Sequence, residues 1–382
     1  MMPNAIRRRT RAGRLAALAL LAVTLATPVA RAQSTLPTLP TRYADSTFWR
    51  LMTEFSEPDG FFQSDNLVSN ETSFQWVVPT LRSMTRPDGV YLGVAPEQNF
   101  TFIAALKPKV AFILDIRRGN LVVHLMYKAL FETSPNRVDF AFRLFGRKRP
   151  DQLATSVGVE ELFAAIASMP ADTAYARAVR QEIKDRLVKG HGFALSQQDL
   201  EWIDYVHGTF AGAGPGVRYN MGRGGYSGFG RMPNYSDLMT ESDSLGTHRS
   251  YLATDESYAT LRDMQERNVI VPFTGDFAGT KALKAFGDYV RANKGVVQAI
   301  YVSNVEQYLF RSADNWRRYY DNVATLPIDS TSVFIRSATQ GWNRVQSPRS
   351  RQNELLCPVQ VLLDAYKAGR IFGYGQVFEL CR

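Results

Sequence analysis

Four short apolar runs in this sequence are each followed directly by polar residues that could bind a ligand. If the runs are strands of one parallel sheet, their carboxyl ends meet at a common edge, where open α/β sheets bind their ligands. We expect the groups at the four ends to share one cleft. They are Gly93, Glu97, Gln98 and Asn99; Asp115, Arg117 and Arg118; Thr274, Gly275, Asp276 and Gly279; and Ser303, Asn304 and Glu306.

Asp115 is the most informative of these candidates. It directly follows the apolar run 110–114 and comes about 20 residues after a glycine turn, the spacing of an acid that binds a ribose. A carboxylate at this place can accept hydrogen bonds from both ribose hydroxyls. The alternative is a structural role, in which Asp115 caps the next helix or pairs with Arg117 or Arg118.

The loop after the first run limits the kind of nucleotide that could bind. Residues 93–97 read Gly-Val-Ala-Pro-Glu, without the second and third glycines that let backbone approach a pyrophosphate. The loop also lacks the lysine and hydroxyl pair of a phosphate-binding loop. A dinucleotide is therefore disfavoured, and the pattern favours a nucleoside without phosphates.

Other chemically capable residues give weaker signals. His124 lies in an apolar helical pattern and is expected to be a packed core or surface histidine and not a base, while His207 is either a general base or part of a solvated loop. Residues 208–230 contain nine glycines and could form a lid over the cleft or a flexible insertion. Two cysteines and four scattered histidines lack the spacing of a metal site.

The pattern of apolar residues predicts the elements that position these groups. Strands are expected near 90–95, 110–114, 269–273, 296–302 and 332–335, with helices between them at 100–106, 120–131, 281–292 and 315–324. Alternating strands and helices predict an α/β fold, a Rossmann-like doubly wound sheet that is mostly parallel. Between about 135 and 268 the alternation stops, which predicts a helical and glycine-rich insertion.

The N-terminus carries the features of a secretory signal. Five arginines up to Arg14 precede the apolar stretch 15–26, and Ala30-Arg31-Ala32 fits a cleavage site before Gln33. An uncleaved anchor is the alternative. We divide the chain into a signal peptide (1–32), a tether (33–46), the first half of an α/β domain (47–134), the insertion (135–267) and the second half (268–382).

Removing the signal peptide changes what the charge implies. Six of the 45 basic residues lie in residues 1–32, which contain no acid, so the net charge falls from +9 to +3. This balance gives no reason to expect nucleic acid as a partner. After export, to a periplasm or the medium, Cys357 and Cys381 could form a disulfide, or they could remain two buried thiols.

The sequence resembles a family of uncharacterised exported bacterial proteins that have a class I S-adenosylmethionine-dependent methyltransferase-like fold. The resemblance is carried by residues 64–71, 93–99, 112–118, 275–279 and 301–308. It implies that Gly93 contacts the amino-acid end of the cofactor S-adenosylmethionine and Asp115 its ribose. We expect the cofactor also to be bound by Glu97, Asn99, Arg117 and Ser303. Two departures are Ala95 at the usual second glycine and the lack of an Asn/Asp-Pro-Pro-Tyr motif.

Two functions fit these features. In the enzyme interpretation, a methyltransferase-like protein binds a nucleoside-type ligand, and Asp276, Asn304 or Glu306 orients the acceptor. In the alternative, the same fold is an exported non-catalytic module for a small ligand or a partner protein. The signal peptide argues against the enzyme, because the methyl donor is made in the cytosol. The mature chain has no predicted membrane span, and the sequence does not indicate an oligomeric state.

Overall fold

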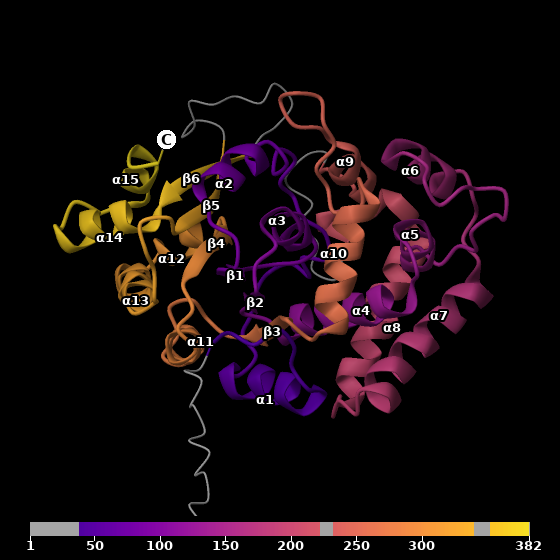
Figure 1. Ribbon diagram of the computed structural model, residues 1–382, viewed down its shortest axis with the longest axis horizontal. Coiled ribbons are helices and arrows are strands. Elements are labelled where there is room, and N and C mark those ends of the chain that lie inside the picture. Colours follow the sequence, from indigo (N-terminus) through magenta and orange to yellow (C-terminus); the bar gives the residue numbers. More distant parts are fainter. Residues whose placement is uncertain (1–37, 222–231, 340–351, 382) are drawn as a thin grey trace, which may run out of the picture. The chain divides into compact units, whose positions relative to one another are not determined.

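The strands form a single sheet at the centre of the described part of the chain. The computed structural model describes residues 38–221, 232–339 and 352–381. In these ranges six strands are ordered β3-β2-β1-β4-β5-β6 (Figure 1). They are β1 (Val90–Gly93), β2 (Val110–Asp115), β3 (Ile270–Thr274), β4 (Val297–Ser303), β5 (Val333–Thr339) and β6 (Gln352–Pro358). Strands β1 to β5 are parallel and β6 is antiparallel to β5, which confirms the predicted Rossmann-like α/β fold.

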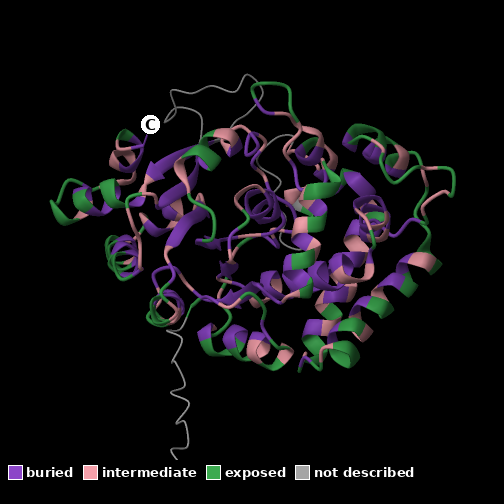
Figure 2. Cartoon of the chain, in the orientation of Figure 1, coloured by how far each residue is buried: buried purple, intermediate pink, exposed green. Residues whose placement is uncertain are grey.

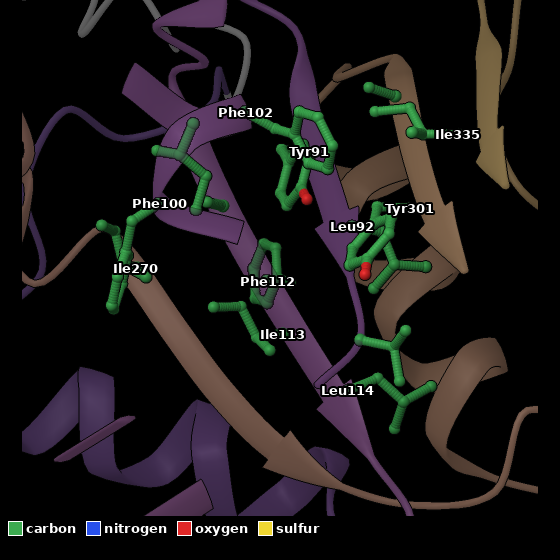
Figure 3. Packing of buried hydrophobic residues seen from close by; sticks show 14 of the residues in the cluster. Tyr91, Leu92, Phe100, Phe102, Phe112, Ile113, Leu114, Ile270, Tyr301 and Ile335 are labelled. Carbon is green, nitrogen blue, oxygen red and sulfur yellow. The ribbon is translucent and has the colours of Figure 1, made fainter. Parts of the chain in front are cut away.

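The central strands are buried on both faces. Every residue of β1, β2 and β3 is buried, as expected for parallel strands that read as continuous apolar runs. Phe112 of β2 packs on one face against Phe55, and Phe100 packs on the other face against Tyr127 and Phe131. Figure 3 shows this core, with side chains standing out from both sides of the strands.

Helices cover each face. One layer contains α1 (Asp45–Phe55), α11 (Ala282–Ala292) and α13 (Ala313–Ala324). The other contains α2 (Val78–Met84), α3 (Gln98–Leu106), α4 (Arg118–Thr133) and α10 (Asp255–Glu266). Helices α1, α10, α11 and α13 each have buried residues on one side and exposed residues on the other, whereas α4 has no exposed residue (Figure 2). In the segment expected to be a tether, Leu39 and Tyr43 are buried in the core, whereas Thr38, Thr41 and Arg42 are exposed.

The chain between β2 and β3 is largely helical. Its further helices are α5 (Arg137–Leu144), α6 (Val159–Ala167), α7 (Thr173–Asp185), α8 (Gln197–Ala213) and α9 (Tyr235–Thr240), which gather to the right of the sheet in Figure 1. Helix α8 begins with a capping box at Ser196 and Asp199. It continues through the first glycines of the expected loop, so His207 lies in a helix and not in a solvated loop. Residues 222–230 of the expected lid lie outside the described residues.

The C-terminal part differs from the prediction in one strand. The helices are α12 (Val305–Leu309), α14 (Val359–Lys367) and α15 (Tyr374–Glu379), and β6 was not predicted. Cys357 in β6 and Cys381 form a disulfide, with their Cα atoms 4.8 Å apart. The predicted signal peptide lies outside the described residues. Within the described ranges, the helices are either too short or too polar to cross a membrane.

Candidate functional site

A cavity lies at the carboxyl ends of β1, β2, β3 and β4. Its volume is about 250 Å³. The sheet order reverses between β1 and β4, and this switch point is where doubly wound folds bind their ligands. We call it the strand-end cavity. It is lined by Phe61, Phe62, Asn66, Val94, Ala95, Asp115, Ile116, Gly275, Asp276, Phe277, Ser303, Asn304, Val305, Tyr308, Leu309 and Asn315.

Asp115 lines this cavity from the end of β2. Its side chain is 6% exposed, and its Oδ1 accepts a hydrogen bond from the backbone amide of Arg117 at 2.9 Å. Burial raises the pKa of Asp115, while the nearby Arg117 charge and the backbone amides of Arg117 and Ala95 act in the opposite direction. Among the described residues, no arginine or lysine forms an ion pair with the Asp115 carboxylate.

The two arginines that follow Asp115 point elsewhere. Arg117 lies 3.8 Å from Asp65 and also donates to the carbonyl of Asp65, while Arg118 pairs with Asp199 at 2.7 Å. Both arginines line a neighbouring cavity of about 230 Å³, which shares only Phe61 and Phe62 with the strand-end cavity. The expectation that Arg117 contacts the cofactor in the main cavity is therefore not met by the geometry.

The loop after β1 is held by a buried asparagine. Asn99 Nδ2 donates to the carbonyls of Val94, Ala95 and Pro96 at 2.8, 2.9 and 2.7 Å. His124 Nε2 donates to the Ala95 carbonyl at 2.9 Å. Burial lowers the pKa of His124 to about 4, so the ring is neutral near pH 7. The carbonyls of this loop are thus turned away from the cavity, and Ala95 takes a positive φ of 65°.

Gly93 and Asn99 position this loop and do not themselves line the cavity. A Cβ atom on Gly93 would come within 1.8 Å of Asn99 Oδ1. Residue 93 is therefore a glycine because the Asn99 side chain fills the space that a Cβ atom would need. This is a different reason from the predicted contact between Gly93 and the cofactor. Asn99 is fully buried, and its Oδ1 accepts from the Tyr91 hydroxyl at 2.9 Å. Both residues shape the cavity from behind.

The loop after β3 is organised by Glu57, which the sequence analysis did not select. Its carboxylate accepts from the backbone amides of Asp276, Lys281 and Ala282 at 2.9, 2.7 and 3.0 Å. A Cβ on Gly279 would come within 2.3 Å of Glu57 Oε2. The glycine therefore leaves room for Glu57. The loop places Asp276 at the cavity, where its Oδ1 accepts from the Ala278 amide at 2.8 Å.

The end of β4 brings Ser303 and Asn304 to the cavity. The register of β4 against β5 shifts between Tyr301 and Ser303, and Ser303 has a positive φ of 49°. Its hydroxyl donates to the buried carboxylate of Glu71. Glu71 also accepts from Gln98 Nε2 at 2.7 Å and from the Tyr301 hydroxyl at 2.9 Å. Ser303 thus connects the cavity to a buried polar network.

Two predicted site acids are buried away from the cavity. Glu306 is 1% exposed, pairs with Arg336 at 2.5 Å and accepts from the Tyr320 hydroxyl at 2.7 Å. This ion pair gives Glu306 a structural role and corrects the expectation that it orients an acceptor. Glu97 is fully buried, and its Oε1 accepts from the Ser69 amide at 3.0 Å. Burial raises the pKa of Glu97 to about 7.

The structure therefore brings together part of the predicted set. Asp115, Asp276, Ser303 and Asn304 line the strand-end cavity, whereas Gly93, Glu97, Asn99, Arg117 and Glu306 do not. The cavity also has an aromatic wall that was not predicted as part of a site, formed by Phe61, Phe62, Phe277 and Tyr308. The sequence feature that could have indicated this wall is the segment 61–71, which is polar and flanked by aromatic residues. It supplies Phe61, Phe62 and Asn66 to the cavity.

His207 and His191 both have structural environments. His207 is fully buried in α8, where its Nε2 donates to the Arg143 carbonyl at 3.0 Å, and burial lowers its pKa to about 4. His191 lies between Asp45 and Glu132, at 2.8 and 2.7 Å. Neither lines the strand-end cavity. Within the described ranges, no three acidic, histidine or cysteine side chains gather as metal ligands would.

Comparison with known proteins gives a family and no activity. No curated protein matches the chain. Residues 66–199 and 219–366 match the family described as "Domain of unknown function (DUF7790)". These two ranges cover more than half of the chain and include the ends of β1, β2, β3 and β4 that form the cavity. The chain therefore belongs to the family described as "Domain of unknown function (DUF7790)".

Proposed function

We propose that the strand-end cavity binds a nucleoside-type ligand similar to S-adenosylmethionine. The observation that carries this proposal is the place of Asp115. Its buried carboxylate faces the cavity at the end of the strand next to β1, without an ion pair among the described residues. A carboxylate in this position can accept hydrogen bonds from the two hydroxyls of a ribose.

The rest of the lining favours a ligand without phosphates. Among the described residues, no lysine, arginine or histidine lines the cavity. Phosphate sites usually offer basic side chains or a glycine-rich loop with outward amides. Here the loop after β1 contains Ala95 and Pro96, and apolar side chains such as Ile116 and Phe277 offer contacts suited to a purine ring.

If the protein is an enzyme, its chemistry depends mainly on positioning. S-adenosylmethionine supplies an activated methyl group when it is bound, so the protein has to hold the donor and acceptor in line. Asp276 and Asn304 line the cavity and can orient an acceptor through hydrogen bonds. Glu306 takes no part in this proposal, because it is paired with Arg336 in the core.

The second candidate is an exported module that binds a small ligand without catalysis. The disulfide between Cys357 and Cys381 favours it, because such bonds persist in oxidising compartments, where the methyl donor is not expected. The same cavity would then hold a related ligand of that compartment. This proposal places the protein in the periplasm or the medium, after cleavage before Gln33.

Calorimetry of the purified protein with S-adenosylmethionine and S-adenosylhomocysteine tests the nucleoside proposal. We expect heat of binding with at least one ligand, and a loss of at least about tenfold in affinity for Asp115→Ala. The exposed Glu161 of α6 gives a control, Glu161→Gln, which should bind as the wild type does. Absence of binding by both ligands would exclude the cofactor, and an unaffected Asp115→Ala variant would exclude the assigned site.

The N-terminus of the native protein separates the two candidates. A chain that begins at Gln33 and is recovered from a periplasmic fraction favours the exported module. A chain with an intact N-terminus in the cytosolic fraction favours the methyltransferase, because the donor is available there. Edman sequencing or mass spectrometry of the fractionated protein gives this result directly.

A further inference from the structure

The charged groups that line the strand-end cavity in the described part of the chain all have the same sign. They are Asp115 and Asp276, and no basic side chain lines the cavity among the described residues. Neither carboxylate forms an ion pair with another described residue. The groups that contact them are backbone amides, those of Arg117 and Ala95 for Asp115 and that of Ala278 for Asp276.

The two carboxylates come from neighbouring strands. Asp115 pairs in register with Thr274 in the β2–β3 ladder, and Asp276 follows two residues after Thr274. The basic side chains nearest to these two carboxylates along the chain bind other groups, whereas the guanidinium of Arg311 lies over the ring of Tyr308, 4.6 Å from its centroid. Arg117 binds Asp65, and the ammonium group of Lys281 donates to the carbonyl of Ser56 at 2.8 Å. The negative potentials of the two carboxylates therefore add in one partly enclosed space.

The other walls of the cavity suit an organic cation. Four aromatic side chains line it, and Phe62 packs edge to face on Tyr308 with ring centroids 5.2 Å apart. The faces of aromatic rings attract ammonium groups, and this attraction is stronger where water is excluded. Asn66 and Asn304 add side-chain carbonyl oxygens that can accept hydrogen bonds from an ammonium group.

We infer that the strand-end cavity selects ligands carrying a positively charged organic group, such as an amine, over neutral and anionic ligands of similar shape. Asp276 is the main determinant, because the proposed ribose contact occupies Asp115. The inference deepens the proposed function and rests on it for the nucleoside part of the ligand. The burial-raised pKa of Asp115 agrees with it, since a buried carboxylate gains from a nearby cation.

Three nucleosides that differ at one position test the inference. They are 5′-amino-5′-deoxyadenosine, adenosine and adenosine 5′-monophosphate, which are cationic, neutral and anionic at neutral pH. Calorimetry on the purified full chain should give a dissociation constant roughly tenfold lower for the amine than for adenosine, and the weakest binding for the monophosphate. Benzyltrimethylammonium and benzenesulfonate provide a pair of probes that lack the nucleoside.

Two variants locate the effect. Asp276→Asn preserves the shape of the side chain and removes its charge. We expect it to bring the affinities for the amine and for adenosine to within about twofold of each other. The exposed control Glu161→Gln should keep the wild-type ratio. Circular dichroism of each variant checks that the fold is retained, and Asp276→Glu, which restores the charge, should recover part of the preference for the amine.

The outcomes distinguish this inference from the proposed function. Equal affinities for the amine and adenosine, or tighter binding of the monophosphate, would overturn the charge selection while leaving a nucleoside site. Binding of benzyltrimethylammonium but not of benzenesulfonate or any nucleoside would support the charge selection and overturn the nucleoside proposal. A preference for the amine that survives in Asp276→Asn would overturn the assignment to Asp276. Absence of binding by all five probes would overturn both.

Discussion

Glu57 Oε2 accepts a hydrogen bond from the backbone amide of Asp276 at 2.9 Å, although the two residues are far apart in the sequence. Glu57 follows α1, whereas Asp276 lies in the loop that joins β3 to α11. The same carboxylate accepts from Lys281 and Ala282, so it also satisfies amides at the start of α11. One side chain outside the cavity thus fixes the loop that presents Asp276 to it.

Replacing this carboxylate should loosen the loop. Glu57→Gln retains a single acceptor oxygen in place of two and removes the charge. We expect a loss of about 1–3 kcal/mol in the free energy of unfolding, because three backbone amides lose a charge-assisted hydrogen-bond partner. Urea unfolding followed by circular dichroism measures this loss.

A residue on the same segment of chain provides the control. Glu54 of α1 is exposed and pairs with Arg50 in the same helix. Glu54→Gln should change the free energy of unfolding by less than about 0.5 kcal/mol, as surface substitutions usually do. If the two variants lose the same stability, the assigned role of Glu57 in the loop is wrong.

Gly275 should not tolerate a methyl group. A Cβ there would come within 2.4 Å of the Cβ of Ala282, in a buried part of the loop. We expect Gly275→Ala to reduce the free energy of unfolding by about 1–3 kcal/mol through overpacking. Gly212 in α8 has open space around its Cβ position. Gly212→Ala should therefore raise stability by about 0.5–1 kcal/mol. Thermal unfolding of both variants checks the opposite signs.

Glu97 should make stability depend on pH. Its pKa is raised by burial to about 7, above the usual value of 4.5. Between these two values the folded state keeps a proton that the unfolded state has lost. This contribution to stability is therefore complete below the unfolded pKa and is lost as pH rises through about 7, by an amount on the order of 3 kcal/mol.

The variant Glu97→Gln isolates this contribution. Glutamine does not titrate, so the variant should lose less stability than the wild type between about pH 5 and about pH 8. The comparison is needed because the pKa of buried His124 is lowered and changes stability in the opposite sense. Denaturant midpoints of both proteins across this range give the difference. Parallel pH profiles would show that Glu97 does not carry the effect.

The sheet could be predicted because its strands are buried on both faces. The run 110–114 is apolar throughout and is followed by an acid. The sequence therefore predicted both a buried strand and the residue at which it ends. Strand β6 was missed because it begins with polar residues, such as Glu354, that face a buried polar network. Its membership in the sheet depends on pairing with β5, a contact with no local signal.

The site was only partly predictable, since the end of a strand can be located from sequence but the direction of a side chain cannot. Asp115 and Asp276 face the cavity, yet Glu306 turns into the core because α12 begins one residue earlier and Arg336 provides a partner. Phe61 and Phe62 line the cavity although they lie far along the chain from its other aromatic residues, Phe277 and Tyr308. Their positions depend on tertiary contacts, which a local sequence pattern does not predict.

A crystal structure of the protein grown with adenosine would locate the ligand directly. We expect the nucleoside in the strand-end cavity, with both ribose hydroxyls within hydrogen-bonding distance of the Asp115 carboxylate. Density for adenosine at another place, or in this cavity with its ribose turned away from Asp115, would show that Asp115 does not bind the ribose.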